Sequence, residues 1–197
     1  MKIFMRILIL VFTVAVMVSL VTFENTCSKL EKDVFRLHIL ANSDSKADQT
    51  LKMKVRDEII SEISPLYVDV QNKEEAMKIT KKNLPLIENK AQQIVSLSGY
   101  DYDVNAMVKN EFFDTRYYDD FTMPAGFYDS LTITIGEAQG KNWWCVMYPS
   151  LCVGASSKLN MKEDLSDDEY RVITSDDVVY KFKIVEYYEK ICSYFNR

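Results

Sequence analysis

The chain has 197 residues, a net charge of −5 and 48% hydrophobic residues. This length fits one domain, and the apolar content is enough for a packed core, which excludes an intrinsically disordered protein. The acidic balance argues against nucleic acid as a partner, because such binding depends on neutralising phosphates, and against electrostatic adhesion to an anionic membrane. A protein or a small molecule remains as the partner class.

The N-terminus has the pattern of an export segment. Lys2 and Arg6 precede residues 7–23, a run without any charge. A run of about 17 apolar residues is the lower limit for a membrane-spanning helix, and no clear cleavage site of small residues follows it. We expect residues 1–26 to be a signal peptide or a membrane anchor. The basic N-terminal side then places residues 27–197, a single domain, outside the cytoplasm.

The first elements expected after this segment are a strand and an amphipathic helix. Residues 34–41 are apolar and rich in β-formers, and in a strand Arg36, His38 and Leu40 share one face. The polar stretch that follows leads into residues 46–64, where apolar side chains recur at about four-residue spacing. This spacing predicts a helix with one buried face.

A second helical region and then a β-rich region follow. Residues 73–98 have a helical apolar face closed by Gly99, and Pro85 inside them predicts a kink or two shorter helices. Later segments alternate as strands, and a short connection suggests a hairpin between the last two. The order predicts an α+β fold in which helices pack on an antiparallel sheet. The expected later strands are residues 102–113, 129–136 and 142–148, and residues 181–197 carry a helical stripe.

The polar stretch before the first helix allows two structural interpretations. Ser45 and Asp48 have the spacing of a capping box, and Asp44 adds negative charge at the helix N-terminus. A calcium-binding loop fits the sequence less well than a capping box, because the spaced oxygen ligands and the glycine of an EF-hand are missing. A motif this polar is also a candidate surface for a partner. The candidate partner-binding residues here are Asn42, Ser43, Asp44 and Asp48.

His38 is the only histidine, so a catalytic relay has one possible imidazole base. The sequence contains no nucleophile elbow, HExxH zinc motif, phosphate-binding loop or dinucleotide fingerprint. A packed strand histidine is therefore the default interpretation, and no catalytic residue is assigned.

The cysteines allow a disulfide or a metal site. Cys145 and Cys152 are separated by a Pro-Ser turn, so the chain can bring them within bridging distance. If strand phasing puts His38 on the same sheet face as Cys145, then His38, Cys145 and Cys152 supply three ligands for zinc. The disulfide is the first interpretation and Zn²⁺ the second, and the two could be redox alternatives of one site. Cys27 and Cys192 have no assigned pairing.

Aromatic residues mark a candidate interaction surface. Strand alternation places Trp143 and Trp144 on opposite faces of their strand, one packed against helices and one open to a partner or solvent. Phe127 and Tyr128 belong to an aromatic stretch with Arg116 nearby, a composition that protein interfaces favour. An equally good interpretation is that these aromatic side chains roof the sheet. Phe127, Tyr128, Trp143 and Trp144 complete the candidate partner-binding set.

Two motifs resemble the stage II sporulation protein R family of endospore-forming bacteria. The first is FRLHILANSDSKADQTLKMKVRD, residues 35–57, and the second is MPAGFYDSLTITIGEAQGKNWWCVMYPSLC, residues 123–152. Ser150 stands where a second proline is common in this family, which leaves the resemblance intact. The resemblance covers residues 35–153.

The resemblance implies a signalling protein rather than an enzyme. Family members are exported from the forespore into the space between the two sporulation membranes. There they activate a membrane-embedded aspartic-type protease, stage II sporulation protein GA, which removes the pro-sequence of sigma-E. No cofactor is required by this function, and a homodimer is not excluded by the sequence.

Two other functions remain open at this stage. One is a small extracytoplasmic hydrolase that uses His38 as a base or a zinc ligand. The other keeps the signalling role and places it under a zinc or disulfide redox switch at Cys145 and Cys152.

Overall fold

The structure is a computed structural model that describes residues 2–118, 121–149, 162 and 165–174. Its helices and mostly antiparallel sheet confirm the predicted α+β class. The chain divides into two compact units, a finer division than the one domain expected for residues 27–197. The first unit contains residues 1–30, 113–126 and 166–197, and the second contains residues 31–112 and 127–165.

The first unit is built around a long N-terminal helix. Helix α1 spans Lys2–Asp33, and its last residues belong to the second unit. The unit also contains a two-stranded sheet of β3, Arg116–Tyr117, and β4, Thr122–Met123. Helix α5, Asp167–Thr174, completes its described part.

The second unit contains a four-stranded sheet with the spatial order β2, β5, β1, β6. The central strand β1 runs parallel to β5 and antiparallel to β6. The predicted hairpin between β5 and β6 is wrong, because β1 lies between them. A parallel pair needs a long crossover, and the helices between β1 and β5 supply it. The bounds are Phe35–Leu40 for β1, Val104–Phe113 for β2, Gly126–Ile135 for β5 and Asn142–Tyr148 for β6.

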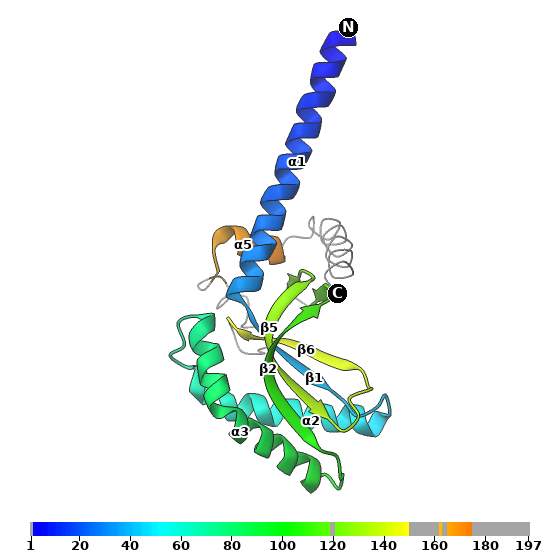
Figure 1. Ribbon diagram of the computed structural model, residues 1–197, viewed down its shortest axis with the longest axis vertical. Coiled ribbons are helices and arrows are strands. Elements are labelled where there is room, and N and C mark those ends of the chain that lie inside the picture. Colours follow the sequence, from blue (N-terminus) through cyan, green and yellow to red (C-terminus); the bar gives the residue numbers. More distant parts are fainter. Residues whose placement is uncertain (1, 119–120, 150–161, 163–164, 175–197) are drawn as a thin grey trace. The chain divides into compact units, whose positions relative to one another are not determined.

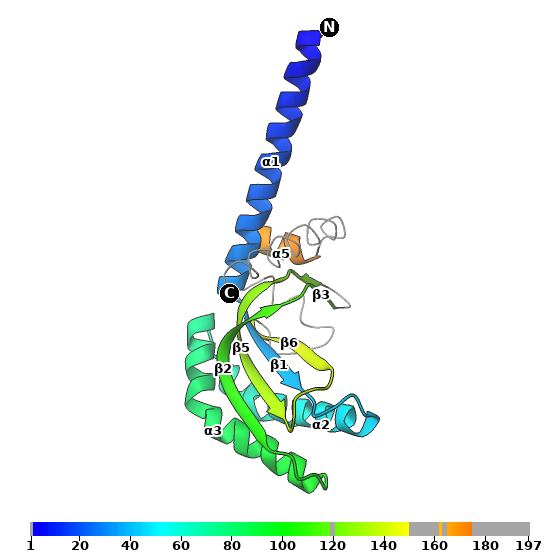
Figure 2. The ribbon, with the colours of Figure 1, turned by 45° about the vertical axis from the view of Figure 1, so that its right-hand side comes forward.

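Two helices cover one face of this sheet (Figure 1). Helix α2 spans Lys46–Ile63 and is followed by a 3-10 turn, Ser64–Tyr67. Helix α3 spans Lys73–Leu97 and remains one helix despite Pro85. Figure 2 shows that α3 bends along its length, in line with the predicted kink.

Alternation along the strands separates an apolar face from a polar face. On β1, the side chains of Phe35, Leu37 and Ile39 enter the core under the helices. The intervening Arg36 and His38 are also buried, but on the opposite face, which confirms the predicted phasing. The core under the helices includes Leu51, Val55, Ile59 and Ile63 of α2, Ile87, Ala91 and Val95 of α3, and Leu131, Ile133 and Ile135 of β5.

Candidate functional site

Two loops meet at one end of the sheet and form the first candidate region, which we call the loop junction. It consists of residues 41–45, between β1 and α2, and residues 136–141, between β5 and β6. Because β5 and β6 flank β1, the second loop has to cross the end of β1. The backbone N–H groups of Gln139 and Gly140 donate to the carbonyl oxygens of Asn42 and Ala41, at 3.1 and 2.9 Å. These bonds hold the crossing.

Side chains of the first loop bind the backbone of the second. The Glu137 N–H donates to Asn42 Oδ1 at 3.0 Å, and the Lys141 N–H donates to Asp44 Oδ1 at 2.6 Å. Asn42 and Asp44 therefore satisfy two backbone N–H groups of the second loop.

Two glycines allow this close approach. A Cβ atom on Gly136 would lie 2.3 Å from Asn42 Oδ1, and Gly136 has a φ of +57°. A Cβ atom on Gly140 would lie 2.2 Å from the Ser43 carbonyl oxygen. No larger residue fits either position without displacing the first loop.

Two side chains of α2 fasten the junction from the helix side. Lys52 is buried, and its Nζ donates to the Lys141 carbonyl oxygen and to Gln49 Oε1, each at 2.7 Å. Gln49 in turn donates to the Ser43 carbonyl oxygen at 2.9 Å. Burial lowers the pKa of Lys52, and the nearby charge of Asp44 partly offsets this effect.

Asp48 gathers the hydrogen bonds of the first loop. Its carboxylate accepts from Ser43 Oγ at 2.5 Å, from Asn42 Nδ2 at 3.0 Å and from the Tyr102 hydroxyl at 3.2 Å. Its N–H donates to Ser45 Oγ at 3.1 Å, which confirms the predicted cap of α2. The hydrogen bond from Ser43 is the main cause that lowers the pKa of Asp48, against the opposing effect of burial.

The loop junction changes the interpretation of the polar stretch. Asn42, Ser43, Asp44 and Asp48 were predicted to bind a partner, and the structure instead uses their side chains to hold the two loops together. Asp44 alone of these four is classed as exposed. A role of these residues in binding a partner stays a prediction, and it would act on an already rigid loop.

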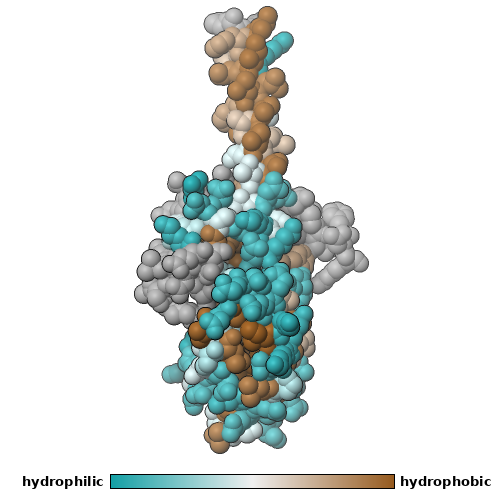
Figure 3. Space-filling model, turned by 90° about the vertical axis from the view of Figure 1, so that its left-hand side faces the viewer, coloured by the Kyte–Doolittle hydropathy of each residue, from teal (hydrophilic) through white to brown (hydrophobic). Residues whose placement is uncertain are grey.

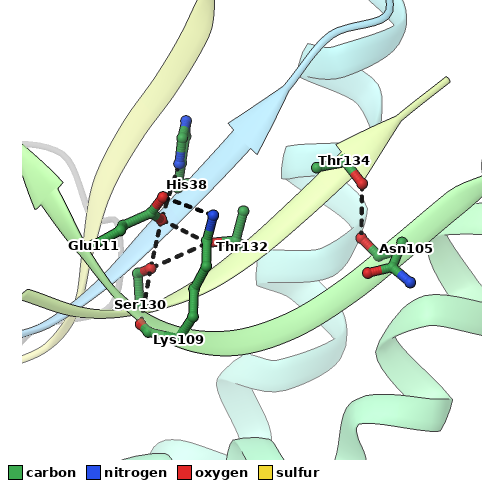
Figure 4. Close-up of polar contacts among 7 residues, drawn as sticks. All are labelled: His38, Asn105, Lys109, Glu111, Ser130, Thr132 and Thr134. Atoms are coloured by element: carbon green, nitrogen blue, oxygen red, sulfur yellow. Dashed lines mark hydrogen bonds and ion pairs between the residues drawn. The ribbon is translucent and has the colours of Figure 1, made fainter. Parts of the chain in front are cut away.

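The second candidate region is a polar network across the face of the sheet opposite the helices. We call His38, Lys109, Glu111, Ser130 and Thr132 the polar network (Figure 4). Thr132 pairs with His38 in the register of β1 and β5, and Lys109 and Glu111 are on β2. The network thus joins three strands, and Trp144 of β6 adds the fourth by stacking on the His38 ring at a centroid distance of 3.7 Å.

Glu111 is the centre of this network. His38 Nδ1 lies 3.0 Å from Glu111 Oε1, and the Ser130 and Thr132 hydroxyls donate to the same oxygen at 2.7 and 2.6 Å. Lys109 Nζ lies 2.9 Å from Glu111 Oε2. Burial alone would raise the pKa of Glu111, but these donors together outweigh burial and hold the pKa well below its ordinary value.

This geometry differs from that of a catalytic relay. In such a relay the hydroxyl donates to the imidazole, which can then accept its proton. Here the Ser130 and Thr132 hydroxyls donate to the Glu111 carboxylate. The network as described fixes strands relative to one another and keeps a carboxylate ionised.

The two tryptophans lie on opposite faces of β6, as predicted. Trp143 packs against the helix-side core, with the Arg56 guanidinium 4.3 Å from its ring centroid. Arg56, Asp57, Ile60, Trp143 and Cys145 line a cavity of about 290 Å³ on that side. Trp144 stacks on His38 on the other side.

Of the remaining two predicted partner-binding residues, only one is exposed. Phe127 is 41% exposed and makes an edge contact with Phe112 at a centroid distance of 5.4 Å. Tyr128 is fully buried, and the Arg36 guanidinium lies 5.0 Å from its ring centroid. Strand alternation turns the Tyr128 ring inward, next to the outward Phe127, and a role of Tyr128 in binding a partner stays a prediction.

The expectation that His38 and Cys145 share a sheet face is wrong. His38 pairs with Trp144, and Cys145 pairs with Leu37, so the imidazole and the sulfur lie on opposite faces. Cys152 lies outside the described residues, so the Cys145–Cys152 pairing and the complete zinc ligand set stay predictions. Within the described residues, no three His, Cys, Asp or Glu side chains are grouped to hold a metal.

The profile of a protein family described as "Stage II sporulation protein R" matches residues 31–158. The chain belongs to the stage II sporulation protein R family. A relative named "Stage II sporulation protein R", from Bacillus subtilis strain 168, is 36% identical over 129 residues, which cover 66% of this chain and 58% of that protein. The chain thus matches somewhat more than half the length of this relative. No solved structure matches the chain.

The family resemblance and the loop junction coincide in space. The two motifs that carry the resemblance supply its two loops, Ala41–Ser45 and Gly136–Lys141. The sequence did not indicate that Gln49 and Lys52 bind the backbone of the loop junction. It also did not indicate that several hydrogen-bond donors surround the Glu111 carboxylate. The alternation in Ser130-Leu131-Thr132, like the shared face of Arg36 and His38, was a signal in the sequence that the second sheet face is polar.

Proposed function

We propose that this protein is the exported signal that activates stage II sporulation protein GA, the membrane-embedded aspartic-type protease, so that pro-sigma-E is processed. Membership in the stage II sporulation protein R family carries this proposal. The N-terminal apolar helix supports it, because a signal made in the forespore has to leave the cytoplasm. The destination is the space between the two sporulation membranes.

The mechanism proposed is a shift of population in the protease. A ligand can activate its receptor only by binding the active arrangement more tightly than the inactive one. The second unit suits this role because its loops are fixed by internal hydrogen bonds, so little conformational freedom is lost on binding. Phe127 and the Trp144 side of the sheet are the parts of the predicted partner-binding set that we assign to the receptor.

Reconstitution in a bacterial host that does not sporulate tests the proposal. The full-length chain, the protease and pro-sigma-E are produced together, and the processed fraction of sigma-E is measured by immunoblot. We expect processing to depend on all three proteins. A matched control is the chain with Leu10→Asp and Val14→Asp, which interrupt residues 7–23 and retain the chain in the cytoplasm. Lack of processing with an exported, folded wild-type chain would overturn the proposal.

A further inference from the structure

The two parts of α1 have different surroundings. Its first part is apolar and exposed: Ile3 is 73%, Leu10 64% and Phe12 70% exposed. The helix is long and apolar enough to cross a membrane, and its most apolar part is not buried. Figure 3 shows this part as a largely brown, hydrophobic helix. Protein atoms do not cover these side chains, so a lipid bilayer is the environment that suits them.

The length and polar groups of this part also fit a bilayer. At 1.5 Å per residue, residues 7–23 span roughly 25 Å, close to the hydrocarbon thickness of about 30 Å. Besides Ser19, residues 7–23 contain two polar side chains, Thr13 and Thr22. Each hydroxyl donates to the carbonyl oxygen one turn earlier, of Ile9 at 2.8 Å and of Val18 at 2.9 Å. Both hydroxyls are therefore satisfied without water.

The second part of α1 is a helix of a folded protein. Phe23, Cys27 and Leu30 recur on one helix face and are 5%, 2% and 0% exposed. Val172 of α5 packs against the cluster of Phe23 and Cys27. Phe23 thus belongs both to the end of the apolar run and to the core of the first unit.

An ion pair fastens the same part of the helix. Lys29 Nζ lies 2.9 Å from Glu169 Oε2, and the Glu169 side chain is only 1% exposed. Further along α1, Glu31 belongs to the second unit, where its carbonyl oxygen accepts from Lys73 Nζ at 3.2 Å and its carboxylate accepts from the Phe127 N–H at 3.3 Å. Only Val34 separates the helix from β1. The helix therefore enters the fold without a linker.

We propose that α1 is retained in the working protein as a membrane anchor. Its second part, which begins at Phe23 and which we call the outer part, is a structural element of the folded domain. A signal peptidase that cut near residue 26 would remove Phe23 from its buried cluster and divide a continuous helix. The segment at the end of the apolar run, Thr22 to Cys27, also lacks the small residues that a cleavage site needs. The inference concerns how the protein is attached and holds for any receptor.

Mass spectrometry of the full-length chain, recovered from the membranes of the producing bacterium, tests the anchor. We expect an intact mass that includes α1, and retention in the membrane pellet after an alkaline carbonate wash. Ser19→Ala with Val21→Ala is the matched control, because it creates a small-x-small cleavage site before Thr22. A wild-type mass that lacks the first 20–30 residues, or release of the wild type by carbonate, would overturn the anchor.

A second pair of variants tests the structural role of the outer part. We expect Phe23→Ala to increase proteolysis around Lys29 several-fold, whereas Phe12→Ala, the same substitution at a position that is 70% exposed, leaves it unchanged. Equal proteolysis of both variants would show that Phe23 is only part of a membrane segment. The processing of pro-sigma-E is scored separately, because an anchored and a released signal can both activate the protease. Failure of the anchor and failure of the proposed function are therefore distinguishable.

Discussion

Asn42 and Gly136 are in direct contact across the loop junction. The amide oxygen of Asn42 accepts the N–H of Glu137 at 3.0 Å, and the same oxygen occupies the space that a Cβ atom on Gly136 would need. An amide side chain and a glycine thus form one structural feature, although they are far apart in the sequence. Stability, rather than direct contact with a receptor, is the first property that this pair should control.

Gly136→Ala should therefore destabilise the protein far more than a comparable substitution elsewhere. The new Cβ atom would add left-handed strain of about 1–2 kcal/mol and an overlap with Asn42 of about 1–3 kcal/mol. Gly99→Ala is the control, since Gly99 has a φ of +84° but nothing within 4 Å of the new Cβ atom. Urea denaturation of both variants gives the comparison. Equal losses of stability would contradict the contact between Asn42 and Gly136.

The buried amine of Lys52 gives a second test of the junction. Lys52→Met keeps most of the side-chain volume but leaves the Lys141 carbonyl oxygen and Gln49 Oε1 without their donor. We expect a loss of about 1–3 kcal/mol of unfolding free energy, the usual cost of an unsatisfied buried polar group. The exposed neighbour on the same helix serves as the control, and Lys54→Met should change stability by less than about 0.5 kcal/mol. If both variants unfold at the same denaturant concentration, Lys52 does not clamp the loops.

The helices and strands of the second unit could be predicted because their signals are local. The apolar spacing of α2, the capping box at Ser45 and the terminating Gly99 each depend on a few neighbouring residues. The alternation of β1 and β6 also fixed which side chains share a face, including Trp143 and Trp144. All of these expectations are confirmed by the structure.

The strand order could not be obtained in this way. A short loop rich in glycine predicts a hairpin between β5 and β6, and nothing in its sequence shows that β1 will enter between them. That insertion is also what brings residues 41–45 against residues 136–141. The same non-local pairing determines the polar network, since Glu111 reaches His38 only because β2, β5 and β1 are neighbours. The sequence therefore identified residues of the loop junction, but their contacts with the second loop could not be predicted from it, and their role in binding a partner stays a prediction.

Glu111 should make stability depend on pH in the acid range. Its pKa is below its ordinary value of 4.5 in the folded protein, so folding favours the ionised carboxylate. This contribution is complete above about pH 4.5, the unfolded pKa, and is lost as the pH falls through the folded pKa. Glu111→Gln should lower stability at neutral pH and flatten the decline below pH 4.5. Denaturant unfolding from pH 7 to pH 2.5 measures both effects.

The flattening should be partial, because Asp48 and Asp129 also have lowered pKa values in the folded protein. Asp101→Asn, which removes an exposed carboxylate outside the polar network, is the control for the loss of one negative charge. A Glu111→Gln variant with the wild-type slope would show that the network does not hold the carboxylate ionised.

Glu169 should stabilise the start of α5 in the first unit. Its carboxylate accepts from the Ser166 N–H at 2.9 Å and pairs with Lys29, so it acts as a capping-box acid and an ion-pair partner. Glu169→Ala should cost about 1–3 kcal/mol and speed hydrogen exchange in residues 167–174. Asp168→Ala is the matched control, because Asp168 is 79% exposed and its contact with Arg171 is 3.8 Å long. Unchanged exchange in the Glu169 variant would refute the capping role.

Variants of Phe127 and Tyr128 distinguish a residue that contacts the receptor from one that contributes to folding. Phe127 is 41% exposed and is held by Phe112, whereas Tyr128 is fully buried beside Arg36. If Phe127 enters the protease interface as an aromatic anchor, Phe127→Ala should lose about 2 kcal/mol of binding, or roughly 30-fold in the ligand concentration that half-activates processing. Its melting temperature should fall less than that of Tyr128→Ala, because the Phe127 ring is 41% exposed and the Tyr128 ring is fully buried. Tyr128→Ala should instead lower the melting temperature and reduce processing only through loss of folded protein. Normal processing by a folded Phe127→Ala protein would remove Phe127 from the receptor surface and leave the Trp144 side of the sheet as the surface to test.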